Sequence, residues 1–235
     1  MQLSTIRLSL FAVVPGLAAL ALTRWDTQLF LWIQAHATRN VDPLWSAITI
    51  IGTAAGIIAL LSPIWRRHPG LGPAIVLSAV ICTLIVQLFK RLTELSRPLA
   101  VLGSDAVHVI GIPLYGRAFP SGHSAAAFAA AAVLIASGVA GRRSSVLLLI
   151  GATLIALSRI VTGAHWPSDV FGGAAVGWLC GLAGYWIASR LPHAVHRGLE
   201  WFAGIVAFAC GLVLVFGDAD YPLAIGFQLA LGTLA

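Results

Sequence analysis

Three residues that could carry out chemistry together lie between Ser158 and Asp169. His165 and Asp169 are four residues apart, the spacing that places two side chains on one face of a helix. A carboxylate beside an imidazole fixes its tautomer and stabilises its charged form. Arg159 adds a cation suited to binding an oxyanion. This stretch therefore predicts a nucleophile, an orienting group and an anion-binding group in one short segment.

Two further clusters precede this segment. Lys90 and Arg97 are seven residues apart, two helical turns, so we expect their side chains to point the same way. Ser121, Gly122 and His123 open an alanine-rich stretch, where Ser121 can cap a helix and the free amides favour an anion. Taken singly, the clusters have ordinary explanations as a juxtamembrane cation pair, an N-cap and a structural His–Asp pair.

The composition indicates an integral membrane protein. Hydrophobic residues make up 59% of the 235 residues, charged residues only 9%, and the mean hydropathy is +0.95. A soluble protein cannot cover its surface with so few charges, whereas a lipid-facing surface needs none. The net charge of +6 is scattered through short loops without a basic stripe, which argues against nucleic acid as a partner.

The apolar runs predict an all-α, polytopic membrane bundle in a single domain, residues 1–235. We expect a six-span core over about residues 1–190 and one or two extra apolar segments over about 199–235. The core spans are Leu8–Leu22, Leu44–Trp65, Leu71–Phe89, Pro120–Ala140, Val146–Arg159 and Pro167–Ala188. The first resembles the apolar part of a signal peptide but is interpreted as a retained span. Asp26–Ala37 is too short and polar to span and is expected in the interface, and Asp42 with Pro43 is expected to start the second span.

The order of the spans predicts that the three clusters lie on the same side of the membrane. Lys90 ends the third span, His123 begins the fourth, Arg159 ends the fifth and His165 precedes the sixth, so all four are expected at one membrane face. Paired arginines follow the second and fourth spans, and Arg7 precedes the first. Since positive residues favour the cytoplasmic side, we expect a cytoplasmic N-terminus and an extracytoplasmic site.

The patterns K-x6-R-P, P-S-G-H and S-R-x5-H-x3-D, in this order from Lys90 to Asp169, resemble the type-2 phosphatidic acid phosphatase family. The resemblance implies metal-independent removal of phosphate from a lipid through a phosphohistidine, with membrane lipids around the protein and no cofactor. His165 would be the nucleophile, Asp169 its orienting group and His123 the acid that protonates the leaving oxygen. The phosphate would be bound by a larger set, namely Lys90, Arg97, Arg159, Ser121 and the Gly122 amide.

The clusters lack the carboxylate or Cys/His density of a metal site, so we expect activity to be insensitive to chelators. Arg91, His108 and Arg117 lie outside the motifs and are either solvated surface residues or a site for a second phosphate. The second reading favours undecaprenyl diphosphate as the substrate. Phosphatidylglycerol phosphate, phosphatidic acid and lipid A phosphate fit as well, and the oligomeric state is not indicated.

Two other classes of protein are open alternatives. A vanadate-dependent haloperoxidase has a similar oxyanion site, but the apolar spans argue against that soluble class. A non-catalytic lipid-binding or transport protein on the same scaffold would be expected to lack a site residue, and every motif position is filled here.

Overall fold

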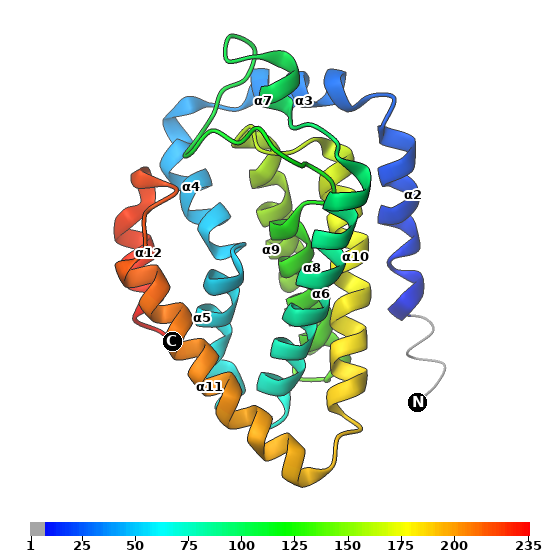
Figure 1. The fold of residues 1–235 in the computed structure, drawn as a ribbon, viewed down its shortest axis with the longest axis vertical. Coiled ribbons are helices and arrows are strands. Elements are labelled where there is room, and N and C mark those ends of the chain that lie inside the picture. Colours follow the sequence, from blue (N-terminus) through cyan, green and yellow to red (C-terminus); the bar gives the residue numbers. More distant parts are fainter. Residues whose placement is uncertain (1–7) are drawn as a thin grey trace.

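The structure, a computed structural model, describes residues 8–235, and every regular element in this range is a helix (Figure 1). The α-helices are α2 (Val13–Leu22), α3 (Asp26–His36), α4 (Asp42–Ile51), α5 (Ala54–Trp65), α6 (Leu71–Thr93), α7 (Pro98–Leu102), α8 (Gly122–Ala136), α9 (Arg142–Val161), α10 (Pro167–Ala188), α11 (His193–Phe216) and α12 (Ile225–Gly232). Short 3₁₀ turns cover Arg39–Val41 and Pro222–Ala224. The predicted all-α class is confirmed. Arg7, used above to orient the chain, lies outside the described residues.

Four helices, α6, α9, α10 and α11, are long and apolar enough to cross a membrane. Two bent pairs raise this number to six, Leu8–Leu22 with Asp26–His36 at 98° and Arg39–Ile51 with Ala54–Trp65 at 71°. The fourth predicted span, α8, has 15 helical residues. At about 1.5 Å per residue it is roughly 22 Å long, shorter than the ~30 Å hydrocarbon core of a bilayer. The third, fifth and sixth predicted core spans therefore meet these criteria alone, as does the predicted seventh, α11, whereas the first and second meet them only as parts of bent pairs.

The second predicted span consists of two helices that meet at a bend of 71°, and not of one continuous helix. α4 ends at Ile51 and α5 begins at Ala54, where Thr53 Oγ1 accepts a hydrogen bond from the Gly56 N–H at 2.9 Å. A Cβ at Gly52 would lie 2.4 Å from Ile155 Cγ2, so the break occurs where the chain approaches α9 closely. The break places Thr53 and Ala54, at the N-terminus of α5, on the wall of a cavity.

Two expected helix ends also differ. α6 continues through Lys90 to Thr93, and Arg97 lies beyond it as the N-cap of α7, so these cations do not share one helix. Arg142 opens α9 instead of closing the preceding helix. Asp42 with Pro43 does begin α4, as expected, although Val41 is the N-cap and the Asp42 carboxylate pairs with His108.

Helix α10 lies at the centre of the bundle, packed against α8, α6, α2 and α9 (Figure 1). Small residues allow the close approach of α8, because a Cβ at Gly177 would lie 2.0 Å from the Ala125 carbonyl oxygen. A Cβ at Gly181 would likewise lie 2.4 Å from the Ala129 carbonyl oxygen. Glycine at these positions therefore lets α10 pack closely on α8, with the first turns of the two helices side by side.

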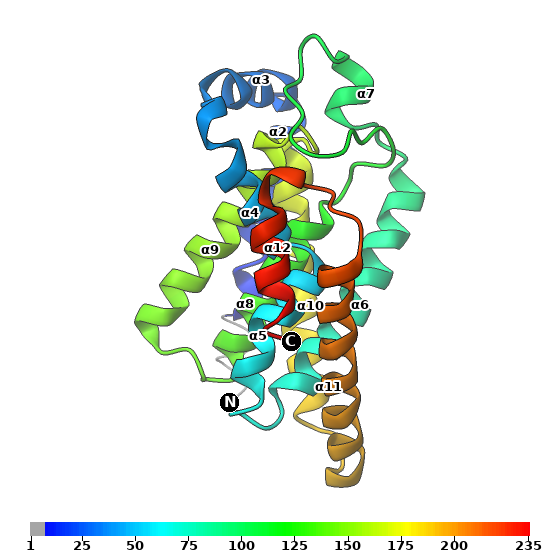
Figure 2. The same cartoon turned by 90° about the vertical axis from the view of Figure 1, so that its left-hand side faces the viewer.

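The segments after the core pack on its outside. α11 runs along α5 and α6, and α12 folds back against α11, α5 and α4 (Figure 2). The outer face of α11 carries Trp201 and Phe216, which are 80% and 81% exposed, as expected for side chains that face lipid. The predicted core boundary near residue 190 falls in the turn between α10 and α11.

Candidate active site

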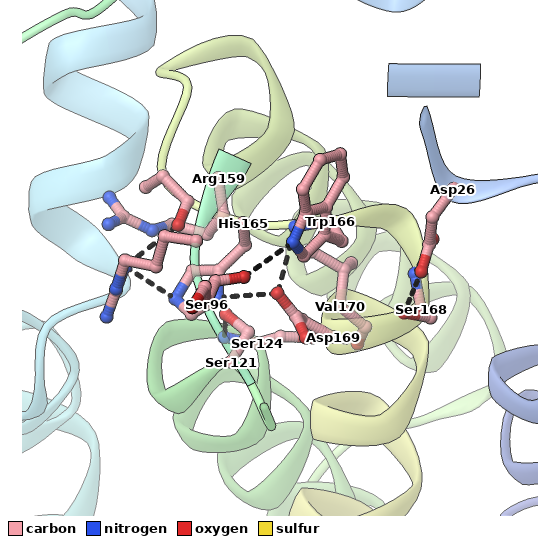
Figure 3. A network of polar contacts seen from close by, with 12 residues as sticks. Asp26, Ser96, Ser121, Ser124, Arg159, His165, Trp166, Ser168, Asp169 and Val170 are labelled. Carbon is pink, nitrogen blue, oxygen red and sulfur yellow. Dashed lines mark hydrogen bonds and ion pairs between the residues drawn. The ribbon is translucent and has the colours of Figure 1, made fainter. Parts of the chain in front are cut away.

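His165 and Asp169 form a buried pair, with their side chains only 2% and 1% exposed (Figure 3). His165 Nδ1 lies 3.2 Å from Asp169 Oδ2, which also accepts the Trp166 N–H at 2.9 Å. The predicted contact is therefore confirmed, although His165 precedes α10, which begins at Pro167. With its Nδ1–H directed at the carboxylate, the imidazole keeps the lone pair on Nε2.

Arg97 lies on the Nε2 side of His165. Its Nη1 donates to the Ala164 carbonyl at 2.8 Å and lies 3.3 Å from His165 Nε2. The backbone before Arg97 is held by Trp166, whose indole N–H donates to the Ser96 carbonyl at 2.8 Å. Residues of the first and third motifs thus meet in space, as predicted.

Burial is the main cause of a shifted His165 pKa. Burial first, and then the charges of Arg97, Arg159 and Lys90, hold the His165 pKa well below its usual range. A histidine with a lowered pKa stays neutral at physiological pH, and neutral imidazole is the nucleophilic form. The electrostatics therefore suit the role predicted for His165.

His123 lies on the first turn of α8, which is tied directly to the first turn of α10. The Ser121 N–H donates to the Asp169 carbonyl at 2.9 Å, and Ser124 Oγ donates to the Val170 carbonyl at 2.7 Å. Within the described part of the chain, His123 Nε2 is buried and has no hydrogen-bond partner. Buried polar atoms normally have a partner, so an unpartnered imidazole nitrogen is a functional candidate.

Ser121 and Gly122 have different roles at the start of α8. Ser121 is fully buried, and its Oγ accepts from the Ser124 N–H at 3.5 Å, so the predicted capping is confirmed. A Cβ at Gly122 would meet no atom within 4 Å. Packing does not require a glycine at position 122. The predicted role of Gly122, to let a ligand approach the backbone, stays a prediction.

A cavity of about 270 Å³ lies between α5, α6 and α8. Its polar wall includes Lys90, Gly122 and His123, together with Thr53 and Gln87. The remaining wall is mostly apolar and includes Ile57, Ile58, Ile75, Val86, Ala126, Ala130 and Val133. One cavity therefore joins residues of the first and second motifs to a surface suited to a hydrocarbon chain.

Arg159 is 2% exposed and is held by two hydroxyl groups that the sequence did not indicate. Its Nη1 donates to Thr49 Oγ1 and to Tyr221 Oη, each at 2.5 Å. Its Nε is buried and has no hydrogen-bond partner among the described residues. A signal existed for Tyr221, because it directly follows Asp218 and Asp220, which span counting places on the side of the site.

Asp26 is a further residue that sequence reasoning missed. Its carboxylate accepts hydrogen bonds from the Ser168 N–H, at 2.8 Å, and from the Ser168 hydroxyl (Figure 3). Helix α3 is thereby joined to the first turn of α10, next to Asp169. Asp26 thus helps to fix where α10 begins.

The three residues predicted to bind a second phosphate have separate surroundings, and none lines this cavity. His108 Nε2 lies 2.8 Å from Asp42 Oδ2, and Arg117 Nη2 lies 3.7 Å from Glu94 Oε1. Arg91 is exposed in the last turn of α6. Their role stays a prediction.

Comparison with known proteins places this geometry in a family. A family model described as the PAP2 superfamily matches residues 72–193, more than half of the chain. The chain is 46% identical over 76 residues to a lipid A 1-phosphatase of Porphyromonas gingivalis (32% of this chain, 17% of the relative). It is 38% identical over 80 residues to phosphatidylglycerophosphatase B of Escherichia coli (32% and 31%), and 30% identical over 168 residues to a lipid A 1-phosphatase of Rhizobium etli (66% and 58%). The chain thus covers between 17% and 58% of the length of these relatives.

Two solved structures share the fold. The crystal structure of Aquifex aeolicus LpxE superposes with a TM-score of 0.61 at 29% identity, covering 68% of this chain and 94% of the other. The crystal structure of a transmembrane PAP2 type phosphatidylglycerolphosphate phosphatase from Bacillus subtilis gives a TM-score of 0.57 at 18% identity, covering 80% and 98%. The chain is accordingly a multi-pass membrane protein.

Proposed function

Because the chain belongs to the PAP2 superfamily, we propose that it is a membrane lipid phosphatase that works through a phosphohistidine on His165. The observation that carries this proposal is the cavity that joins Lys90 and His123 to an apolar wall. A phosphate bound at its polar end would lie beside Lys90 and His123, and a lipid chain would occupy the rest.

In the first step His165 Nε2 attacks phosphorus and the bond from phosphorus to the lipid oxygen breaks. The incoming phosphate would take over the Arg97 contact that Nε2 makes in the free site, at 3.3 Å. The negative charge of the bound phosphate would favour a protonated His123, which gives its Nε2 proton to the lipid oxygen, so the lipid leaves as an alcohol. Asp169 stabilises the positive charge that forms on His165.

In the second step water attacks the phosphohistidine. His123 Nε2, now neutral, takes a proton from the water, and the phosphorus–nitrogen bond breaks to restore the His165 lone pair. Inorganic phosphate is released. Through both steps Lys90, Arg97 and Arg159 stabilise negative charge on the phosphoryl oxygens.

We propose a lipid phosphate monoester as the substrate, such as the phosphorylated lipid A or phosphatidylglycerol phosphate named for the relatives. Support comes from His108 and Arg117, since each already has a carboxylate partner. Undecaprenyl diphosphate is the second candidate, because Arg91 is exposed directly after Lys90 and offers a cation for a second phosphate.

We further propose that the site faces the extracytoplasmic side. Arg66 is the C-cap of α5, Arg142 opens α9, Arg190 follows α10 and Arg197 lies in the first turns of α11. Arginines at these helix ends, away from the turn between α9 and α10 that carries His165, favour the cytoplasm. A reporter fused after Arg143 should accordingly be active in the cytoplasm. Reporter activity outside the cell would contradict this orientation.

The decisive experiment is phosphate release by the purified, detergent-solubilised protein across a panel of lipid phosphates and diphosphates. His165→Ala should abolish release and prevent labelling of the protein by substrate carrying radioactive phosphate. His193→Ala, an exposed histidine at the start of α11, is the matched control and should retain both. Turnover by His165→Ala would refute the phosphohistidine, and halide oxidation with added vanadate would favour a haloperoxidase.

The predicted independence from metal ions has its own test. In the part of the chain that the structure describes, no group of three or more His, Cys, Asp or Glu residues could hold a metal ion. We expect phosphate release to be unchanged after prolonged treatment with a chelator. Loss of activity that an added divalent cation restores would contradict a metal-independent mechanism.

A further inference from the structure

The Arg159 guanidinium is held by hydrogen bonds at Nη1, whereas its Nε has no hydrogen-bond partner among the described residues. Both described contacts of Nη1 are to hydroxyl oxygens, Thr49 Oγ1 on α4 and Tyr221 Oη after α11. Nε is buried and has no partner among residues 8–235. A guanidinium carries five N–H donors in a planar fork, and its Nε–Nη2 edge matches two phosphate oxygens. An anchor on Nη1 leaves that edge for an oxyanion.

Tyr221 is itself held firmly in place. Its side chain is 5% exposed, and the Arg159 Cζ lies 5.9 Å from the centre of its ring. The preceding carbonyl, that of Asp220, accepts the Ile112 N–H at 3.1 Å. Gly111 has a φ of +87°, and a Cβ there would lie 2.6 Å from the Tyr221 ring. The loop between α7 and α8 therefore packs directly on this tyrosine.

We propose that Tyr221 is a positioning residue for the phosphate-binding edge of Arg159, so that the C-terminal segment completes the active site. The family model ends at residue 193, so this contact comes from a part of the chain beyond the matched region. The inference rests on the proposed function only in assigning phosphate binding to Arg159. The proposal gives the segment after α11 a role in the site, in addition to its packing against the core.

The physical argument concerns the freedom of a long side chain. Arginine loses much rotamer freedom when it is fixed in one geometry. The hydroxyls of Thr49 and Tyr221 fix Arg159 before substrate arrives. The loss of side-chain entropy therefore does not weaken phosphate binding. Without the Tyr221 hydroxyl, one Nη1–H loses its acceptor, and the guanidinium can turn to satisfy it elsewhere. The free edge would then no longer be held toward the phosphate.

The test is Tyr221→Phe, which removes one oxygen and keeps the ring. We expect kcat/KM for a lipid phosphate, and affinity for inorganic vanadate as an oxyanion probe, each to fall about tenfold, as for loss of one hydrogen bond to a charged group. Tyr185→Phe, a half-buried tyrosine near the far end of α10, is the matched control and should stay within about twofold of the wild type.

A double-mutant cycle separates positioning from general stability. In an Arg159→Lys background the geometry of the fork is gone, so Tyr221→Phe should cost little more. A merely structural tyrosine would cause the same fold-loss in both backgrounds, and that result would overturn the proposal. Wild-type kcat/KM and vanadate affinity in Tyr221→Phe would overturn it as well.

Thr49→Val supplies a second route in case Tyr221→Phe folds poorly, which thermal melting in detergent would reveal. It removes the other acceptor on Nη1 and should lower vanadate affinity to a similar degree. Unchanged vanadate affinity in Thr49→Val would count against an anchored Arg159. Vanadate binding, measured by calorimetry, needs no turnover. If the wild type hydrolysed no lipid phosphate, the proposed function would fail while the role of Tyr221 was still tested.

Discussion

The central helices α8 and α10 and the C-terminal helices α11 and α12 stand in different relations to the candidate site. α8 and α10 are joined near the site through backbone atoms, including the Ser121 N–H and the Asp169 carbonyl at 2.9 Å. The C-terminal region contacts the site through the Tyr221 hydroxyl, which accepts a hydrogen bond from Arg159. The positions of His123 and His165 therefore depend on helix packing, whereas the position of Arg159 depends on individual contacts with hydroxyl groups.

This difference predicts how each region responds to change. A substitution between α8 and α10 moves His123 relative to His165 and also opens the centre of the bundle. A substitution on the outer face of α11 alters a surface that is mostly exposed, as Trp201 at 80% illustrates. Stability and catalysis should accordingly be coupled in the centre and separable at the C-terminus.

The largest expected effect is on the orienting carboxylate of α10. Asp169→Asn should lower kcat by about 10³–10⁴-fold, because an amide can favour the wrong tautomer of His165. Glu200→Gln, the same change on α11, should leave kcat within about twofold, since Glu200 contacts Gly70 and His196 away from the site. Phosphate release at saturating substrate measures both. Similar losses in the two variants would contradict the contrast between the regions.

Packing between the central helices provides the next prediction. Gly177→Ala should lower the free energy of unfolding by about 1–3 kcal/mol, because the new Cβ would lie 2.0 Å from the Ala125 carbonyl oxygen. Gly204→Ala on α11, where a Cβ meets nothing within 4 Å, should be neutral or stabilise by up to about 1 kcal/mol. Unfolding in detergent gives both values. Equal destabilisation would show that the two helix pairs do not differ in packing.

The pH dependence tests the burial of the central site. Since burial and nearby cations lower the His165 pKa, the neutral nucleophile should persist as the pH falls through 6.5, the ordinary histidine value. The acid limb of kcat/KM should therefore have a midpoint below 6.5. In Arg97→Gln one cation is lost, so the midpoint should move upward while total activity falls. Ionisation of the substrate is common to both proteins, so an unchanged or lower midpoint would contradict this account.

The smallest effect is expected at Arg117, which pairs with an exposed carboxylate at 3.7 Å. Arg117→Ala should change the free energy of unfolding by less than about 0.5 kcal/mol, as is typical for surface pairs. If Arg117 binds a second phosphate, kcat/KM should fall for a lipid diphosphate and not for a monophosphate. Equal losses for both substrates would argue against that role.

Much of this protein follows from local properties of the sequence. Apolar runs identified five of the six core spans, two of them as parts of bent helix pairs, because a bilayer demands long hydrophobic segments. Span counting then placed His123 and His165 on one side of the bundle, and their motifs are in fact joined by hydrogen bonds. The contact between His165 and Asp169 also followed from sequence spacing, because four residues is a short distance along the chain.

The tertiary structure decided the contacts that join distant parts of the chain. The Arg97 contact to His165 arises after α6 has ended, so no helical spacing could predict it. The anchors of Arg159, Thr49 and Tyr221, are separated from it by 110 and 62 residues. A hydroxyl group carries no sequence signal for the arginine that it will meet, because only the packing of α4, α9 and the C-terminal segment brings these atoms together.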